Sequence, residues 1–314
     1  MDRSAASCIL ALIAGVSLAA CSKTAEEPLP APAPAAAAAP VADAAPSNSQ
    51  SFKIGELTAV ALRDGGLEPP NDNQVFGVGL KPEDVAAVLS ANNLPTDKLS
   101  LSVQPLLVKT ADRVLLFDTG AGSLFGPGTG KIGASLAEAG VDAGSITDIF
   151  ISHSHGDHIG GLVNAEGALA FPNAAIHLSK PEWDHLSGQQ NMAALASAMK
   201  PRVQAFAPGA ELIPGVVTAV EIKGHTPGHS GYRITSGADS LLYVGDSMHH
   251  YVVSVQKPEW TIAFDGDNAT ATASRIALLN ELAASGQRVY AVHFPYPGLG
   301  KMEKRGETVV WVAE

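Results

Sequence analysis

The chain has 314 residues, of which 31 are acidic and 20 basic, giving a formal charge of −11, and 46% are hydrophobic. This hydrophobic content is typical of a globular protein, and the acidic excess argues against nucleic-acid binding, which requires a basic surface. Both cysteines, Cys8 and Cys21, lie near the N-terminus. A disulfide framework, a cysteine-ligated metal site and a cysteine nucleophile are therefore excluded for the rest of the chain.

Residues 1–20 are typical of a secretory signal peptide. Arg3 gives a short basic start, and the apolar run Cys8–Leu18 is too short to span a bilayer. The run ends in Leu-Ala-Ala before Cys21, which resembles the bacterial lipobox, where the cysteine is lipidated and becomes the first mature residue. An ordinary signal peptide is the alternative. We expect an exported, periplasmic or cell-envelope lipoprotein, held at a membrane surface by a lipid on Cys21.

Residues 21–50 are predicted to be a linker. Within it, residues 28–46 contain 6 proline and 10 alanine residues among 19. Such a segment cannot bury a core, and its prolines favour an extended chain. The folded domain is therefore expected over residues 51–314.

Short apolar runs bounded by turn residues predict strands. The runs Ser102–Lys109 and Arg113–Asp118 flank a turn and predict a hairpin. Five others are predicted after the strand Thr147–Ser152: Val216–Ile222, Gly231–Thr235, Leu241–Val244, Arg288–Val292 and Thr308–Val312.

Helices are predicted between these strands. Lys131–Ala139 is followed by the stop residue Gly140, and Asn268–Ser285 by Gly286. The second helix carries a predicted apolar face of four residues: Ile276, Leu279, Leu282 and Ala283. Strands and helices in this mixed order indicate a layered α/β or α+β fold.

A histidine cluster follows the strand Thr147–Ser152. His153 and His155 are separated by one residue, so both side chains can turn toward one metal ion as the chain leaves the sheet. Asp157 and His158 can then face a second ion from the same loop. Imidazole and carboxylate groups together suit zinc and its first-row neighbours.

Three later residues occupy similar positions at strand ends. His229 lies in the loop segment GHTPGHS, Asp246 follows the run Leu241–Val244, and His293 follows Arg288–Val292. Polar side chains in strand-end loops can converge on one rim of a scaffold. Together with the histidine cluster, they predict a single coordination site.

With these residues, the chain resembles the metallo-β-lactamase-fold hydrolases, and the segment Phe117-Asp118-Thr119-Gly120 is a further match. The resemblance covers the whole domain and implies a four-layer αββα sandwich. It implies two metal sites bridged by Asp246. The first would use His153, His155 and His229, and the second Asp157, His158 and His293.

The segments GHTPGHSGY, GDSMHH, VQKPEW and HFPYPGLG are similar to methyl parathion hydrolase-type members, which hydrolyse phosphotriesters, aryl esters and lactones. Acyl-homoserine-lactone lactonases share the ligand set and are close alternatives. β-Lactamase-like activity is less favoured, because those enzymes usually have Cys or Ser near the position of Asp246. Ribonuclease-type relatives would need a basic channel that the acidic chain does not support.

The ligand types imply the chemistry. We expect two divalent metal ions, zinc by default with manganese, cobalt or iron open, that share a hydroxide as nucleophile. The substrate class is a small-molecule ester, lactone or phosphotriester. Asp246 and Asp157 are the predicted catalytic residues. Asp246 would offset the repulsion between the metals. Asp157 would bind a metal, and it could also hold the proton of the hydroxide.

Other side chains are predicted around the metals. Asp118 is expected to hydrogen-bond a ligating histidine, with a turn-capping role as the alternative. His225 would orient the loop that carries His229 or be exposed. The candidate residues of the substrate pocket, with core packing as the alternative for the two aromatics, are Phe125, Trp183, His249 and His250. His177 and His185 are interpreted as structural or surface residues.

Two other functional classes remain alternatives. An iron-dependent oxidoreductase of the same fold would show iron colour and oxygen uptake, although a single iron would leave Asp157, His158 and His293 without a role. A metal-retaining binding lipoprotein would show no turnover. Neither the physiological substrate nor the oligomeric state follows from the sequence.

Overall fold

The computed structural model describes residues 47–314. The predicted signal peptide, Cys21 and nearly all of the predicted linker lie outside the described residues. The first strand begins at Ser49, close to the predicted start of the domain. Among the described residues, no helix has both the length and the apolar character that a membrane crossing requires.

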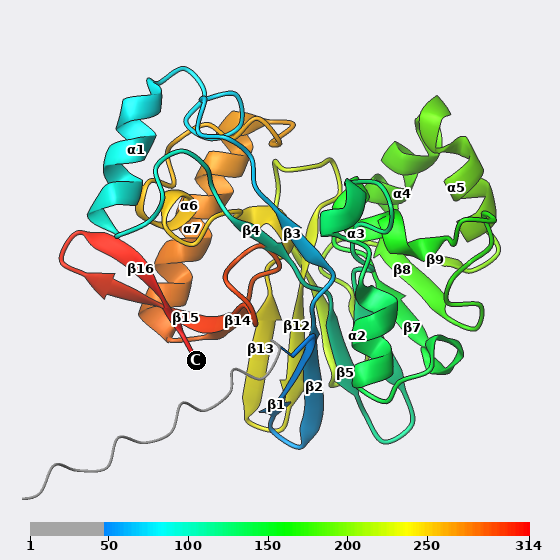
Figure 1. Cartoon of the computed structure of the whole chain (residues 1–314). Coiled ribbons are helices and arrows are strands. Elements are labelled where there is room, and N and C mark those ends of the chain that lie inside the picture. Colours follow the sequence, from blue (N-terminus) through cyan, green and yellow to red (C-terminus); the bar gives the residue numbers. More distant parts are fainter. Residues whose placement is uncertain (1–46) are drawn as a thin grey trace, which may run out of the picture. The chain divides into compact units, whose positions relative to one another are not determined.

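Two seven-stranded sheets form the centre of the molecule (Figure 1). The first sheet is mixed, because its last four strands run parallel to one another and the others pair antiparallel. Its strands, in spatial order, are β1 (Ser49–Ile54), β2 (Leu57–Leu62), β5 (Leu106–Lys109), β6 (Val114–Phe117), β7 (Asp148–Phe150), β8 (Ala175–Ser179) and β9 (Val203–Phe206).

The second sheet holds the C-terminal half of the chain. One pair, β13 and β14, is parallel, and the remaining pairs are antiparallel. Its strands, in spatial order, are β10 (Glu211–Ile213), β11 (Val217–Glu221), β12 (Ser230–Ser236), β13 (Asp239–Tyr243), β14 (Arg288–Tyr290), β15 (Leu299–Arg305) and β16 (Thr308–Ala313). A separate two-stranded sheet pairs β3 (Gly65–Leu67) with β4 (Leu101–Val103).

Helices cover the outer faces of both sheets (Figure 1). α2 and α4 contact strands of the first sheet, and α6 and α7 contact strands of the second. The helices are α1 (Pro82–Ala91), α2 (Ile132–Glu138), α3 (Gly156–Ile159), α4 (Lys180–Gly188), α5 (Ala193–Met199), α6 (Val253–Gln256) and α7 (Asn268–Ser285). The expected four-layer αββα sandwich is confirmed.

The core between the sheets contains a cluster of aromatic rings among aliphatic side chains. Phe117 of β6 stacks on Phe150 of β7, with ring centroids 5.0 Å apart. From the facing sheet, Tyr232 lies 5.6 Å from Phe117, and Tyr243 stacks on Tyr290 at 5.7 Å. Buried aromatic rings in such pairs add directional packing to the burial of apolar area. This rigid layer ends where the strand-end loops begin.

The predicted hairpin is β5–β6, and the run Ser102–Lys109 is interrupted so that its first residues belong to β4. The predicted helix Asn268–Ser285 is α7, begun by the side chain of Asp267 and ended by Gly286 at φ +65°. One residue of its predicted apolar face, Ile276, is 37% exposed, and Leu278 is buried instead. Which of these residues is buried depends on the side of α7 that packs against β15 and β16.

Candidate metal centre

The predicted ligands converge at one edge of the paired sheets. His153 follows β7, Asp157 and His158 lie on the short helix α3, and His229 immediately precedes β12. Asp246 lies in the 3₁₀ turn Gly245–Ser247 after β13, and His293 follows β14. Segments far apart in the sequence therefore place imidazole and carboxylate groups within one small region.

Asp246 lies at the centre of this region, and its two carboxylate oxygens face different groups. Its Oδ1 lies 3.2 Å from Nε2 of His158 and 3.2 Å from Nε2 of His293. Its Oδ2 lies 3.7 Å from Nε2 of His153 and 3.5 Å from Nε2 of His225. A carboxylate with this arrangement can contact two cations at once.

One potential metal site is formed on the Oδ1 side. Asp157, His158 and His293 offer ligand atoms that all lie within 4.8 Å of one another. The Oδ2 atom of Asp157 is 3.4 Å from Nε2 of His293 and 3.7 Å from Nε2 of His158. These three residues form the set predicted for the second metal.

A second potential site, on the Oδ2 side, contains His153, His155, His225 and Asp246, and a third group joins His225 to His249 and Asp265. The Nε2 atom of His225 lies 3.1 Å from Nε2 of His153 and 3.0 Å from Nδ1 of His155. His229 is adjacent, but its Nε2 accepts a hydrogen bond from the backbone N–H of Asp246 at 2.9 Å. His225 thus occupies the ligand position that was predicted for His229 from the sequence. The assignment of His229 as a ligand stays a prediction.

Backbone carbonyls hold two of the histidine rings. Nδ1 of His293 donates to the carbonyl of Ser102 at 2.7 Å, and Nδ1 of His229 donates to the carbonyl of Ile222 at 3.0 Å. Because a carbonyl only accepts, each Nδ1 carries a proton, and in the neutral ring Nε2 then keeps its lone pair. Metal-ligating histidines are typically fixed in this way.

A carboxylate holds a third ring. Asp118, at the end of β6, accepts a hydrogen bond from Nδ1 of His158 at 2.7 Å. It also accepts from the Ser152 backbone and hydroxyl and from the Tyr243 hydroxyl, each at 2.7 Å. The backbone of Asp118 is left-handed, at φ +57°, which Asp tolerates better than most residues. Asp118 therefore contacts a predicted ligand, as expected.

The residues fit divalent metal ions. Nε2 of His158 and Oδ1 of Asp246 are both buried and have no hydrogen-bond partner among the described residues. Buried polar atoms without partners are costly in a folded protein, and a cation between them would satisfy both. The nitrogen and oxygen donor set suits zinc and similar ions.

The pKa shifts differ across this cluster: burial lowers the pKa of His158 and His293, but the nearby Asp246 and Asp157 outweigh it and raise the pKa of both rings. Burial lowers the pKa of His153 well below its usual range, which leaves its ring neutral. Burial raises the pKa of Asp246, but the nearby His158, His293 and His153 hold it well below its usual range. A neutral imidazole and an ionised carboxylate are the forms that bind metals.

Glu182 connects two of the loops and was not predicted from the sequence. It is fully buried at the start of α4, where its carboxylate accepts from the backbone N–H of Ser154 at 2.8 Å. Its other oxygen accepts from the Thr226 hydroxyl at 2.7 Å and the Gly228 backbone at 2.9 Å. Glu182 therefore ties the loop of His153 and His155 to the loop of His225 and His229.

Asp265 and Arg275 were also missed. Asp265 accepts a hydrogen bond from Nδ1 of His225 at 2.9 Å and pairs with the guanidinium of Arg275. Arg275 is 1% exposed and also donates to the carbonyls of Ser247 and Pro258. Arg275 is the one basic residue of α7, and the sequence around it gives no signal of its burial.

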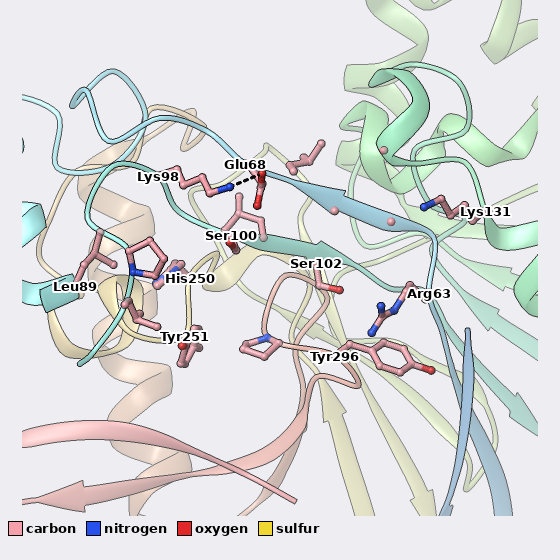
Figure 2. A pocket seen from close by; sticks show the side chains of 18 residues that line it. Arg63, Glu68, Leu89, Lys98, Ser100, Ser102, Lys131, His250, Tyr251 and Tyr296 are labelled. Atoms are coloured by element: carbon pink, nitrogen blue, oxygen red, sulfur yellow. Dashed lines mark hydrogen bonds and ion pairs between the residues drawn. The ribbon is translucent and has the colours of Figure 1, made fainter. Parts of the chain in front are cut away.

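A cavity of about 390 Å³ opens onto the metal-binding groups. Two of the predicted pocket residues, Phe125 and His249, line it. His250 instead lines a neighbouring cavity (Figure 2). Trp183 lines neither of these cavities and packs against the core over the first sheet, so its assignment to the substrate pocket is corrected.

Apolar side chains from separate segments complete this cavity. Phe264, which is 41% exposed, lines it together with Ala263, and β3 and β4 contribute Leu67 and Leu101. Phe264 was missed because no local pattern distinguishes it from core aromatics. The histidines interpreted as structural agree with that interpretation: His177 stacks on Phe150 at 4.8 Å, and His185 is exposed on α4.

Comparison with known proteins places the chain among metal-dependent enzymes. In solved structures, it is similar to AidC, a dizinc quorum-quenching lactonase in complex with a product, N-hexanoyl-L-homoserine. The two share 32% identity and a TM-score of 0.79 over 85% of this chain and 98% of that chain. It shares the fold of the hydrolase AbOPH, at 24% identity and a TM-score of 0.77 over 86% and 99% of the two chains.

Among curated sequences, it is 30% identical over 163 residues to a hydroxyacylglutathione hydrolase of Jannaschia sp. strain CCS1, covering 46% of this chain and 57% of that protein. The chain spans between 21% and 58% of the length of the curated relatives that it matches. The family model of the metallo-beta-lactamase superfamily matches residues 101–293, which include every predicted metal ligand. The chain therefore belongs to the metallo-beta-lactamase superfamily.

Proposed function

We propose that the chain is a dinuclear metal-dependent hydrolase of small-molecule lactones and esters. The observation that carries this proposal is the position of Asp246, whose two carboxylate oxygens face two separate groups of histidines. The likeness to a dizinc lactonase at 32% identity supports the lactone as first choice.

The proposed ligands follow from these groups. His158, His293 and Asp157 hold one ion, and His153 and His155 hold the other, with Asp246 shared between them. The third imidazole of the latter site comes from the loop that carries His225 and His229. The zinc content of the His225→Ala and His229→Ala variants shows which of the two histidines is the ligand, because only the loss of a ligand removes an ion.

Two bound divalent ions would supply a nucleophilic water at neutral pH and an electrophile for the scissile carbonyl. The chain's own groups do the remaining work. Asp246 offsets the positive charge of the site. Asp157, at the cavity wall, accepts the proton of the attacking water and passes it to the alkoxide that leaves when the C–O bond of the substrate breaks. Phe125 and Phe264 form apolar walls that bind the acyl part of the substrate and exclude bulk water.

The test is turnover by the purified, zinc-loaded protein. We expect kcat/KM for an N-acyl homoserine lactone or an aryl ester to exceed that for a β-lactam and a dimethyl aryl phosphotriester by about tenfold or more. Asp246→Asn should abolish turnover, whereas Asp184→Asn, which removes an exposed carboxylate on α4, should not change it. Full metal loading with no turnover of any substrate, together with oxygen uptake by the iron form, would favour the oxidoreductase alternative.

We also propose that Cys21 carries a lipid that anchors the protein to a membrane surface. The Leu-Ala-Ala-Cys sequence and the following proline- and alanine-rich segment support this, since the segment can serve as a spacer between anchor and domain.

A further inference from the structure

A second cavity, of about 640 Å³, lies beside the metal-binding cavity. Leu67 and Leu101 line both cavities, so the two-stranded sheet of β3 and β4 forms the wall between them. None of the proposed metal ligands lines the second cavity. It is therefore a separate compartment that the proposed hydrolysis does not use.

The two ends of this cavity differ in character (Figure 2). Arg63, Lys131 and Tyr296 lie at one end. The other end has Leu89, Tyr251 and His250, and Leu94 and Pro95 also line the cavity. Polar groups between the ends include Ser100 and Ser102. The cavity thus offers a cationic end and an apolar, aromatic end.

The cations at the polar end have no carboxylate partner among the described residues. The guanidinium of Arg63 lies over the ring of Tyr296, 4.4 Å from its centroid, and its buried Nε has no hydrogen-bond partner within residues 47–314. Lys98 lines the same cavity but is neutralised by Glu68 at 2.8 Å. Glu68 is the one acidic residue of the lining, and it pairs with Lys98. The lining therefore has a net positive charge, which Arg63 and Lys131 provide.

One buried aspartate, Asp64, fixes the backbone segments from which both cationic side chains project. Asp64 accepts hydrogen bonds from the backbone N–H groups of Ala121, Gly130 and Ile132 at 2.8, 3.1 and 2.9 Å. The backbone N–H of Lys131 donates to the carbonyl of Asp64 at 3.0 Å, and Arg63 directly precedes Asp64. The backbones that carry the two positive charges are therefore fixed before any ligand arrives, which lowers the entropic cost of binding.

We propose that this cavity binds an amphipathic organic anion, with a carboxylate or phosphate head between Arg63 and Lys131 and an apolar body toward Leu89 and Tyr251. An unpaired guanidinium stacked on an aromatic ring is suited to carboxylates and phosphates. A chain with a formal charge of −11 repels anions in general, so two unpaired cations at one cavity end provide local selectivity. The binding does not depend on turnover at the metal centre.

The test is calorimetric titration of the metal-loaded full chain with octanoate and octyl phosphate. Octanol, which lacks the charge, and inorganic phosphate, which lacks the apolar body, are the comparison probes. We expect Arg63→Met and Lys131→Met each to weaken binding of the two anions by about tenfold or more. Lys304→Met removes the same charge from an exposed position on β15 and should leave the affinity unchanged.

One further variant and the exposed position of Lys131 keep the test decisive. Arg63→Lys keeps the charge and should lose less affinity than Arg63→Met. Lys131 is exposed and its side chain has no hydrogen bond within the described residues, so Lys131→Met decides the matter if Arg63→Met does not fold. Equal binding of octanol, equal binding of inorganic phosphate, or unchanged affinity in both cavity variants would overturn the proposal. The last result would indicate that the anion binds at the metals instead.

Discussion

Nε2 of His158 and Oδ1 of Asp246 lie 3.2 Å apart, yet neither atom has a hydrogen-bond partner among the described residues. Asp118 holds the opposite nitrogen of the same ring, so the ring cannot turn away without breaking a 2.7 Å hydrogen bond. A cation bound between these two buried atoms would satisfy both of them, as a metal-binding site requires.

Asp118→Asn should weaken zinc binding by about tenfold to a hundredfold, the usual effect of losing a partner of a ligating histidine. Asn tolerates the left-handed backbone at this position, so the variant changes charge and hydrogen bonding while retaining the local conformation. Chelator competition measures the affinity. Unchanged affinity would show that Asp118 only closes a turn.

Glu182→Ala should lower the free energy of unfolding by about 3 kcal/mol, because buried donors on two loops lose their acceptor. It should also weaken zinc binding, since those loops carry His153 and His225. Glu281→Gln, an exposed site on α7, is the matched control. Urea unfolding and chelator competition measure the two effects, and normal values of both in Glu182→Ala would refute the role assigned to this residue.

Asp148 makes folding sensitive to acid. Burial raises the pKa of Asp148, but hydrogen bonds from His177, Thr147 and Arg113 outweigh it and lower the pKa from 3.8 to about 2. A carboxyl whose pKa is lower in the folded state stabilises the fold above its ordinary pKa, and this contribution disappears as the pH falls toward the folded value. Because Arg113 is partly exposed, we expect about 1–2 kcal/mol at neutral pH.

The measurement is urea unfolding of the wild type and Asp148→Asn. The variant should be less stable at about pH 7, and the difference should shrink between about pH 4 and pH 2. A difference independent of pH would mean that packing, rather than charge, accounts for the role of Asp148.

Cys21→Ser should move the protein from the membrane fraction to the soluble fraction, because the thiol that accepts the lipid is lost. Cys8→Ser, within the predicted signal peptide, is the control and should remain with the membranes. Fractionation followed by immunoblotting measures the distribution. Retention of Cys21→Ser on membranes would contradict lipidation at this residue.

Local patterns predicted a layered fold of mixed strands and helices and the segments that carry the metal-binding groups. His153 to His158 form a dense motif at a strand end, and Asp246 and His293 also follow predicted strands. Their convergence at one edge of the sheets could therefore be predicted. The resemblance to a known family supplied the sandwich and the division of ligands between two sites.

What could not be predicted depends on side-chain direction after folding. His249 and His250 are neighbours in sequence, but only His249 faces the metal-binding cavity. Trp183 packs on the core because its face of α4 lies over the first sheet. Glu182, one residue earlier, is buried through contacts with loops about 28 and 44 residues away, which no local spacing encodes.

The central claim is that Asp246 is shared by two metal ions. Zinc content per chain, measured by mass spectrometry after dialysis of the wild type, Asp246→Asn and the control Asp184→Asn, tests it most directly. We expect about two ions in the wild type and the control, and one or fewer in Asp246→Asn, which keeps the shape of the side chain but loses its charge. A single ion in the wild type, or two ions retained in Asp246→Asn, would contradict the shared site.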